Sequence, residues 1–442
     1  MKKTENTILF YTSKNFIFRS GIIGYLYEIC QVYSVILLSE ELDEETDGLI
    51  RDKKLFPKLE KIIPVRQYSG KKMNLFSRNR YLCGLAENVI FKRRPDILMT
   101  ISDTHSIFDL YLMRFAKRIK AIKIAVQSSN MENNTIVKKY IDLENANIRF
   151  PLFLPLWFRI FLMNLRKYAG HFLYYWLLPL TVGERPFFGK VGHILWMGCS
   201  GRKGADYQTV FSKRDYDIHV QDGVPAKKIY IVTHPVLGKA KEFFEKIFLK
   251  SAKRGNDDKK IITFIWPAEE IGFRRLNYSL ISKEENQNIR KEIISLTAKI
   301  LQDWKIFLKP HPDIVDLKEI KDIFKSISDL VEITDQLDPI DKYLEISDVI
   351  VGIPPCSTAI FTAFLQYPKK PLLTIDLSRE VFGDSYKDFG GIEYIDNKEK
   401  FTEILELIRD NKYRKRCEVK LEPEGFMSIT NFLKFLLKEH GK

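Results

Sequence analysis

The chain has 442 residues, of which 45% are hydrophobic and 29% charged, and its formal net charge is +14. This length can bury two ordinary domain cores, and the hydrophobic content excludes a disordered chain. The positive charge is spread along the sequence, so it favours an anionic partner: a phosphorylated substrate, a nucleic acid or an acidic membrane surface. The five cysteines form no CxxC pair. They fit reduced thiols in a cytoplasmic protein better than a disulfide framework or a zinc site.

Strand-like and helix-like segments alternate along the chain. The first apolar run, Ile8 to Tyr11, is too short for a signal-peptide core and predicts a first strand. Further short apolar runs bounded by polar turns are typical of parallel strands. We expect strands at residues 7–11, 33–38, 96–101, 122–127, 193–197, 228–232, 261–266, 304–308, 348–352 and 371–375, with helices near 22–30, 105–118, 284–302 and 359–365 and more at the end.

This alternation predicts an α/β protein with two doubly wound, Rossmann-like domains and a cleft between them. The charged segment 250–260 has the composition of a linker, and the pattern restarts after it. We therefore expect one domain at residues 1–250 and a second at 251–442. Ser20 and Gly21 form the loop after the first strand, which in this layout approaches the acceptor substrate.

Residues 150–182 depart from this plan, because they are dense in Phe, Leu, Trp and Tyr. A membrane-spanning helix needs about 20 nearly uninterrupted apolar residues, whereas Arg159, Arg166 and Lys167 interrupt this segment, as do three prolines. Apolar bulk with interleaved cations is typical of an element that lies in the membrane interface. The alternative is a hydrophobic helical insertion buried against the first domain.

Two loops in the second half carry groups that could bind a phosphate. Lys309, His311 and Pro312 come directly after one predicted strand, and Ser357 and Thr358 follow another. The Ser-Thr pair also opens an apolar helical run, so its hydroxyls and free backbone N–H groups lie at a positive helix end. Together the loops predict a phosphate site. The alternative for His311 is a loop residue that caps a neighbouring carbonyl group.

These two loops, with the segment 346–352 between them, resemble the C-terminal domain of GT-B glycosyltransferases. The closest subset makes bacterial surface polysaccharides: the capsule, polysialic acid and teichoic-acid polymerases. Residues 223–235 are similar to the element that commonly ends the N-terminal domain in that family, and residues 384–391 suit its nucleotide-side loop. The resemblance extends from residue 194 to the end, and over the first 190 residues only in architecture.

The resemblance implies that the His-Pro and Ser/Thr motifs hold the phosphates of a nucleotide-activated sugar, with no metal ion and no bound cofactor. Positive helix ends, His and Lys would neutralise the leaving group instead. The Gly-Gly-Glu-Glu type signature of nucleotide-sugar 2-epimerases, which share the fold, does not follow Gly352. Its absence argues against epimerisation.

Sugar transfer also needs a base that activates the acceptor hydroxyl. Asp103 and His105 follow a predicted strand of the first domain, where desolvation could raise the pKa of a carboxylate towards neutrality. The alternative is that Asp103 caps the helix 105–118. Glu269 and Glu270 could bind hydroxyls of the donor sugar, or could simply start a helix.

The sequence thus predicts a cytoplasmic glycosyltransferase, peripherally associated with the cytoplasmic membrane through residues 150–182. It would move a sugar, of hexosyl, sialyl or Kdo type, from a nucleotide-activated donor to a glycan or lipid-linked acceptor in capsule or lipopolysaccharide biosynthesis, with inversion at the anomeric carbon. A polyol-phosphate transferase or nucleotide-sugar epimerase of the same fold and a non-catalytic membrane scaffold remain alternatives. A nucleic-acid-binding protein is disfavoured, because the sequence has no nucleic-acid recognition motif.

Overall fold

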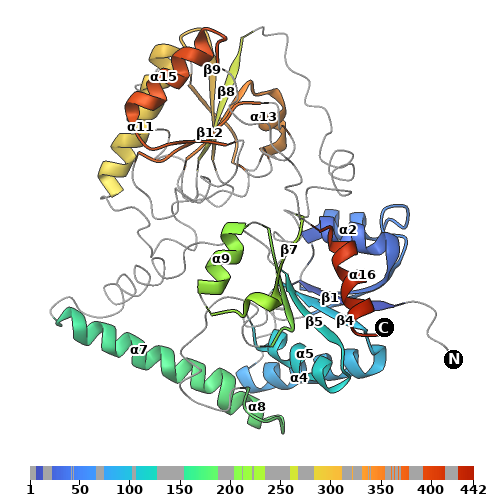
Figure 1. The fold of residues 1–442 in the computed structure, drawn as a ribbon. Helices are drawn as coiled ribbons and strands as arrows, with labels where there is room; N and C mark the ends of the chain where they lie inside the picture. The colour runs from blue at the N-terminus through green and yellow to red at the C-terminus, as the bar shows by residue number, and fades with distance from the viewer. Residues whose placement is uncertain are drawn as a thin grey trace. The chain divides into compact units, whose positions relative to one another are not determined.

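The chain forms two compact units in a computed structural model (Figure 1). The first unit comprises Met1–Asn134, Ile160–Phe243 and Glu422–Lys442, and the second comprises Thr135–Arg159 and Phe244–Leu421. The structure describes residues 6–12, 22–40, 42, 44–65, 74–101, 106–126, 154–187, 204–211, 213–221, 223–233, 259–266, 283–310, 321, 331–336, 338, 340–353, 360, 363, 367, 370–377, 392–413 and 427–442.

The first unit is built on a seven-stranded sheet with the order β3-β2-β1-β4-β5-β6-β7, in which all the strand pairs are parallel. The strands are β1 (Thr7–Thr12), β2 (Ser34–Ser39), β3 (Leu59–Pro64), β4 (Ile97–Thr100), β5 (Ile122–Val126), β6 (Tyr207–Val210) and β7 (Ile229–Ile231). The helices of this part of the chain are α2 (Ile23–Val32), α3 (Glu44–Ile50), α4 (Leu75–Arg93), α5 (Ile107–Arg118), α7 (Leu156–Phe172), α8 (Leu178–Leu180), α9 (Lys213–Gln221) and α16 (Ile429–Glu439).

The second unit repeats this plan in a six-stranded parallel sheet with the order β10-β9-β8-β11-β12-β13. Its strands are β8 (Ile261–Trp266), β9 (Lys305–Pro310), β10 (Val331–Ile333), β11 (Val349–Gly352), β12 (Leu372–Ile375) and β13 (Glu393–Ile395). Its helices are α11 (Lys283–Ile300), α13 (Ile340–Ile346) and α15 (Lys398–Arg409).

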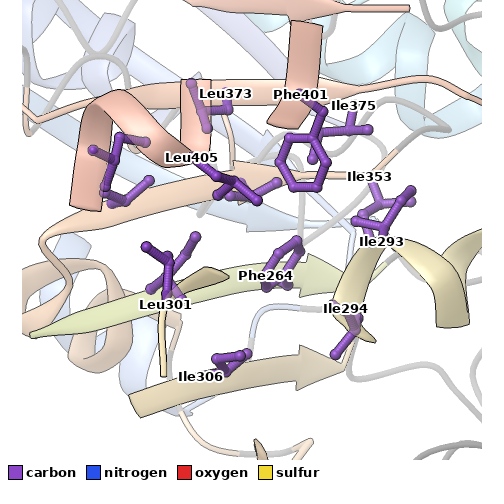
Figure 2. Packing of buried hydrophobic residues seen from close by; sticks show 14 of the residues in the cluster. Phe264, Ile293, Ile294, Leu301, Ile306, Ile353, Leu373, Ile375, Phe401 and Leu405 are labelled. Carbon is purple, nitrogen blue, oxygen red and sulfur yellow. The ribbon is translucent and has the colours of Figure 1, made fainter. Parts of the chain in front are cut away.

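Helices cover both faces of the second sheet, as successive residues of β9 demonstrate. Side chains alternate between the two faces along a strand. Ile306 belongs to the apolar cluster formed with α11 and α15, in which Phe264, Ile294 and Phe401 also lie (Figure 2). The next residue, Phe307, packs instead against Tyr343 of α13, with 5.5 Å between the ring centroids. A sheet buried on both faces explains the nearly continuous apolar runs of its central strands.

The structure confirms the predicted fold class, two Rossmann-like α/β units. The predicted strands that lie in the described residues all occur, whereas the expected strand at 193–197 falls outside them. The strands β3, β6, β10 and β13 were not predicted. Three of these, β3, β10 and β13, are edge strands with at most one buried residue each, so they lack a continuous apolar run. Strand β6 reads Tyr-Gln-Thr-Val, in which two of its buried residues are polar.

The last helix, α16, belongs to the first unit, so the predicted division at residue 250 assigns it to the wrong domain. Phe432 of α16 packs on Tyr230 of β7, with ring centroids 4.9 Å apart. The ammonium of Lys442 donates hydrogen bonds to the carbonyl oxygens of Asp96 (3.2 Å) and Lys120 (2.8 Å). The strongly amphipathic α16 therefore covers apolar surface of the first unit, a long-range contact that a linear division of the sequence cannot include.

The aromatic segment predicted at 150–182 contains α7, which continues through a π-helical turn, η2 (Leu173–Leu177), into α8. Within the described residues no helix is long and apolar enough to cross a membrane. Part of the segment packs on the first unit: Tyr175 is buried against Leu110 of α5. Other side chains of the segment, among them Trp157 and Leu165, are largely exposed. The segment is thus neither fully buried nor fully free of the domain.

Candidate functional site

The order of the strands reverses direction once in each sheet, between β1 and β4 and between β8 and β11. At such a switch point the loops on the two sides leave in opposite directions and open a crevice outside the carboxyl ends of the strands. Ligand-binding groups are therefore expected in the loops that follow β1, β4, β8, β9 and β11.

The predicted site residues follow these same strands in the sequence. Most of them fall outside the described residues, and only Lys309 is described. Ser20 and Gly21 follow β1, Asp103 and His105 follow β4, Glu269 and Glu270 follow β8, His311 and Pro312 follow β9, and Ser357 and Thr358 follow β11. In the sequence, one group thus follows strands of the first sheet and the other follows strands of the second. The roles of these side chains stay predictions.

Lys309, near the end of β9, is buried and binds main-chain carbonyl groups from two loops. Its ammonium donates hydrogen bonds to the carbonyl oxygens of Pro310 (3.1 Å), Asp335 (3.1 Å) and Gln336 (2.9 Å). An ammonium has three N–H donors, so these three acceptors match its full capacity. Lys309 therefore ties the start of the loop after β9, which carries His311, to the segment after β10.

Burial and the nearby acidic residues act on the pKa of Lys309 in opposite directions. Burial lowers the pKa of Lys309 below its usual value, and the negative charges of Asp338 and Asp335 raise it. The pKa of Asp338 is itself lowered, first by a hydrogen bond from the Tyr343 hydroxyl (2.5 Å) and then by one from Lys342 (3.0 Å). The lysine is thus a desolvated cation that stays in place through carbonyl and carboxylate partners.

A second buried cation lies beside the end of β8. The guanidinium carbon of Arg290, on α11, lies 5.5 Å from the ring centroid of Trp266, the last residue of β8. Arg290 is 1% exposed. The second sheet therefore has buried positive groups next to the carboxyl ends of two adjacent strands, an electrostatic setting that favours an anionic ligand.

The end of β11 is packed closely against the residues that follow it. A Cβ atom added to Gly352 would lie 3.0 Å from Cδ1 of Ile360, and both Ile360 and Ala363 are helical and fully buried. This packing agrees with the apolar helical run predicted after Ser357 and Thr358. The packing also explains why a glycine occupies position 352: without a side chain there, Ile360 can approach the strand closely.

At the carboxyl edge of the first sheet the buried groups are acids and hydroxyls. Tyr11, at the end of β1, is fully buried and donates a hydrogen bond of 2.7 Å to Oε1 of Glu40, which follows β2. Burial raises the pKa of Tyr11 well above its usual value, and the charges of Asp109 and Glu40 raise it further. The hydroxyl therefore remains protonated and ties the ends of β1 and β2 together.

The loop after β4 ends in a capping box at the start of α5. Oδ2 of Asp109 accepts hydrogen bonds from the backbone N–H (2.8 Å) and the hydroxyl (2.9 Å) of Ser106, and Oγ of Ser106 accepts one from the backbone N–H of Asp109 (3.2 Å). The helix begins at Ile107, so Ser106 is its N-cap. The alternative role predicted for Asp103, N-cap of a helix starting at His105, is therefore wrong.

Sequence reasoning missed several described polar groups at these edges: the Tyr11–Glu40 pair, Asp109 and Arg290. Only the capping box has a local signal, since Ser-x-x-Asp before an apolar run is a helix-start pattern. A further carboxylate, Asp376, is buried just after β12 and accepts a hydrogen bond of 2.8 Å from the Tyr394 hydroxyl. The described residues contain no group of His, Cys, Asp and Glu side chains that could hold a metal ion.

Comparisons with known proteins identify the fold but no sequence family. No family model and no curated protein sequence matches the chain. The chain is similar in structure to a putative UDP-N-acetylglucosamine 2-epimerase from Listeria monocytogenes, with a TM-score of 0.55 at 10% identity, covering 99% of this chain and 97% of that one. The two Rossmann-like units, with their parallel sheets, and the similarity to these solved structures define a GT-B-type fold.

Two further solved structures have comparable similarity. The UDP-GlcNAc 2-epimerase from Neisseria meningitidis, bound to UDP-GlcNAc, has a TM-score of 0.53 at 12% identity, with 98% of each chain covered. A glycosyltransferase from Rickettsia africae has a TM-score of 0.51 at 12% identity, covering 99% of this chain and 98% of that one. These neighbours catalyse different reactions on one fold, so the fold alone does not select a reaction.

Proposed function

We propose that the protein is a GT-B enzyme that acts on a nucleotide-activated sugar and binds the phosphates of the nucleotide at the carboxyl edge of the second sheet. The observation that carries this proposal is the strand order: His311 follows β9 in the sequence, Ser357 and Thr358 follow β11, and both strands pair with β8 at the switch point between β8 and β11. The buried cations Lys309 and Arg290 support it, because they make this edge electropositive. Solved structures of this fold that carry UDP or UDP-GlcNAc also support it.

In this proposal the second-unit residues have different tasks. His311 donates to the leaving phosphate, while the hydroxyls and backbone N–H groups of Ser357 and Thr358 bind it from a helix end. The ammonium of Lys309 already binds three carbonyl groups. It therefore acts by positioning the loop of His311 and by its charge. Pro312 keeps that loop extended, and Glu269 and Glu270 bind hydroxyls of the sugar.

The reaction we propose first is transfer of the sugar to a glycan or lipid-linked acceptor in bacterial surface polysaccharide synthesis, without a metal ion and with inversion at the anomeric carbon. Asp103 or His105 would remove the proton of the acceptor hydroxyl, and the loop of Ser20 and Gly21 would contact the acceptor. The resemblance of the two loops to capsule, polysialic acid and teichoic-acid polymerases supports this choice. So does the absence of a Gly-Gly-Glu-Glu type signature after Gly352.

Epimerisation of a nucleotide sugar is the second candidate, and one observation favours it: several of the similar solved structures are UDP-GlcNAc 2-epimerases. The two reactions differ in the bond that breaks at the sugar. Inversion at C2 requires loss of the C2 proton, whereas transfer leaves that bond intact. Incubation with UDP-GlcNAc in D2O therefore separates them: epimerisation introduces deuterium at C2, and transfer or hydrolysis releases UDP without exchange.

The donor site itself is tested by thermal unfolding with UDP, CMP, CDP, GDP and dTDP. A ligand that binds only the folded state at about 100 times its Kd stabilises the protein by about 2.7 kcal/mol. We expect one nucleotide to raise the Tm, and we expect the shift to be lost in both His311→Ala and Ser357→Ala. Lys305→Ala, an exposed position on the same strand as Lys309, is the control and should keep the shift. A panel in which no nucleotide raises the Tm would contradict the proposal.

A further inference from the structure

Segment 156–187, of which all but the first four residues belong to the first unit, carries a surface that the proposed reaction does not use. Trp157, Leu165 and Phe172 of α7 are 70%, 55% and 38% exposed. At 3.6 residues per turn these three positions fall within an arc of about 80° on one side of the helix. Large exposed apolar groups that share one helix face are typical of an interaction surface.

The apolar surface continues beyond α7 onto the following turn and a neighbouring helix. Tyr174, Leu177 and Leu180 are between 41% and 53% exposed, and Phe76 at the start of α4 is 55% exposed. The side-chain amide of Asn79 binds α8 to α4, donating to the carbonyl oxygen of Leu178 (2.7 Å) and to Oγ1 of Thr181 (3.2 Å). We call these exposed residues the α7–α8 apolar face.

Positive charges outnumber negative ones around this face, although Glu87 is exposed on the same side of α4 as Phe76. The sequence has no Asp or Glu between Glu144 and Glu184, although it has four Arg or Lys residues there. Arg166 on α7 and Arg185 after α8 are exposed. Arg80 is exposed one helical turn after Phe76, on the same side of α4. Glu184 itself is neutralised by Arg118 (2.7 Å) and Arg114 (3.3 Å).

We propose that the α7–α8 apolar face docks on an anionic membrane surface, with α7 lying in the plane of the interface. Exposed Trp, Tyr, Phe and Leu side chains would enter the boundary between headgroups and acyl chains, where aromatic residues are enriched in membrane proteins. Arg80 and Arg185 would bind the anionic headgroups. The apolar area and the absence of acidic residues between Glu144 and Glu184 together favour this occupant over a protein.

The π-helical turn η2 shows how such a docked helix is fixed to the unit. Tyr175 points inward and is 6% exposed, while its neighbour Tyr174 is 43% exposed. Burial, and then the charge of Asp109, raise the pKa of Tyr175 to about 12. Tyr175 therefore lies near the capping box that begins α5. Docking through this face would bring the start of α5 close to lipid.

The test measures binding of the full chain to vesicles. We expect flotation with phosphatidylcholine vesicles that contain about 30% phosphatidylglycerol, and much weaker flotation with pure phosphatidylcholine. The variant Trp157→Gln/Leu165→Gln/Leu177→Gln should bind the anionic vesicles at least about tenfold more weakly. The control Val32→Gln/Val220→Gln removes exposed apolar side chains from α2 and α9 and should bind normally. Replacing Arg80 or Arg185 by Gln should weaken binding about fivefold each.

Three results would overturn the proposal. One is no binding to either kind of vesicle, and another is equal binding by the triple variant and the native protein. The third is a concentration-dependent dimer that the triple variant loses, because the face would then be a contact between two copies of the chain. Nucleotide-induced Tm shifts are measured without vesicles, so a failure of membrane docking and a failure of the proposed function are distinguishable.

Discussion

The carboxyl edges of the two sheets differ in the buried charges that hold their loops, although the second edge also carries the buried carboxylate of Asp376. In the second unit a lysine and an arginine lie beside the ends of β9 and β8, and Lys309 binds carbonyl groups. In the first unit the buried group is the carboxylate of Asp109, which binds N–H and O–H donors. In both units the charge fixes the loop that follows a strand. This difference agrees with the proposed function, in which groups of the second sheet bind phosphates and groups of the first sheet act as acids or bases.

The largest loss of stability is expected on replacing Lys309, whose buried ammonium binds carbonyl groups of two segments. Replacing Lys309 by Met leaves three carbonyl groups without their donor, so the free energy of unfolding should fall by about 2–4 kcal/mol. Urea denaturation of the full chain measures this change. The matched control is Lys305→Met on the same strand, which removes a solvent-accessible ion pair with Glu332 and a contact of the ammonium with the Phe307 ring (4.7 Å), and should cost less than about 1 kcal/mol.

The Lys309→Met variant also tests whether this lysine contributes to nucleotide binding at the second sheet. If Lys309 positions the loop of His311, the variant should bind the stabilising nucleotide more weakly even under conditions in which it is fully folded. Equal stability of Lys309→Met and the native protein would show that the three carbonyl groups find other partners, and the second edge would then lack its structural cation.

The sequence predicts the frame of this molecule better than its site. Continuous apolar runs identify central strands such as β1, β8 and β11, because both of their faces are buried. The partners of Lys309 could not be read from the sequence, since Asp335 and Gln336 lie 26 and 27 positions away and contribute only backbone oxygen atoms. A lysine after a strand was therefore predicted to bind phosphate, although its ammonium binds carbonyl groups. Only local patterns such as Ser106-x-x-Asp109 reveal a polar contact in advance.

A smaller effect is expected at the carboxylate of the first unit. Asp109→Ala removes the capping box of α5 and should lower the free energy of unfolding by about 1–2 kcal/mol. It should also lower the pKa of Tyr11, because the charge of Asp109 contributes to raising that pKa. Asn397→Ala, which removes the N-cap of α15 in the second unit, is the control. It should cost about 1 kcal/mol and leave the alkaline titration of Tyr11 unchanged.

The smallest effect is expected for the hydroxyl that joins β1 to β2. Tyr11→Phe removes the hydrogen bond to Glu40 and should cost about 1 kcal/mol at neutral pH. The sign of its pH dependence follows from the raised pKa of Tyr11. The folded protein retains the phenol proton more firmly than the unfolded chain, so this contribution to stability is complete below pH 10 and declines as the pH rises above it.

The native protein should therefore lose stability more steeply above about pH 10 than Tyr11→Phe does. Glu40→Gln provides the control, because it keeps an acceptor for the hydroxyl while removing one of the charges that raise the pKa of Tyr11. Its curve should lie between the other two. Parallel stability curves for the native protein and Tyr11→Phe would mean that this phenol does not sense the acids around it. In that case the acids at the carboxyl edge of the first sheet would not have the electrostatic effect that distinguishes this edge from that of the second sheet.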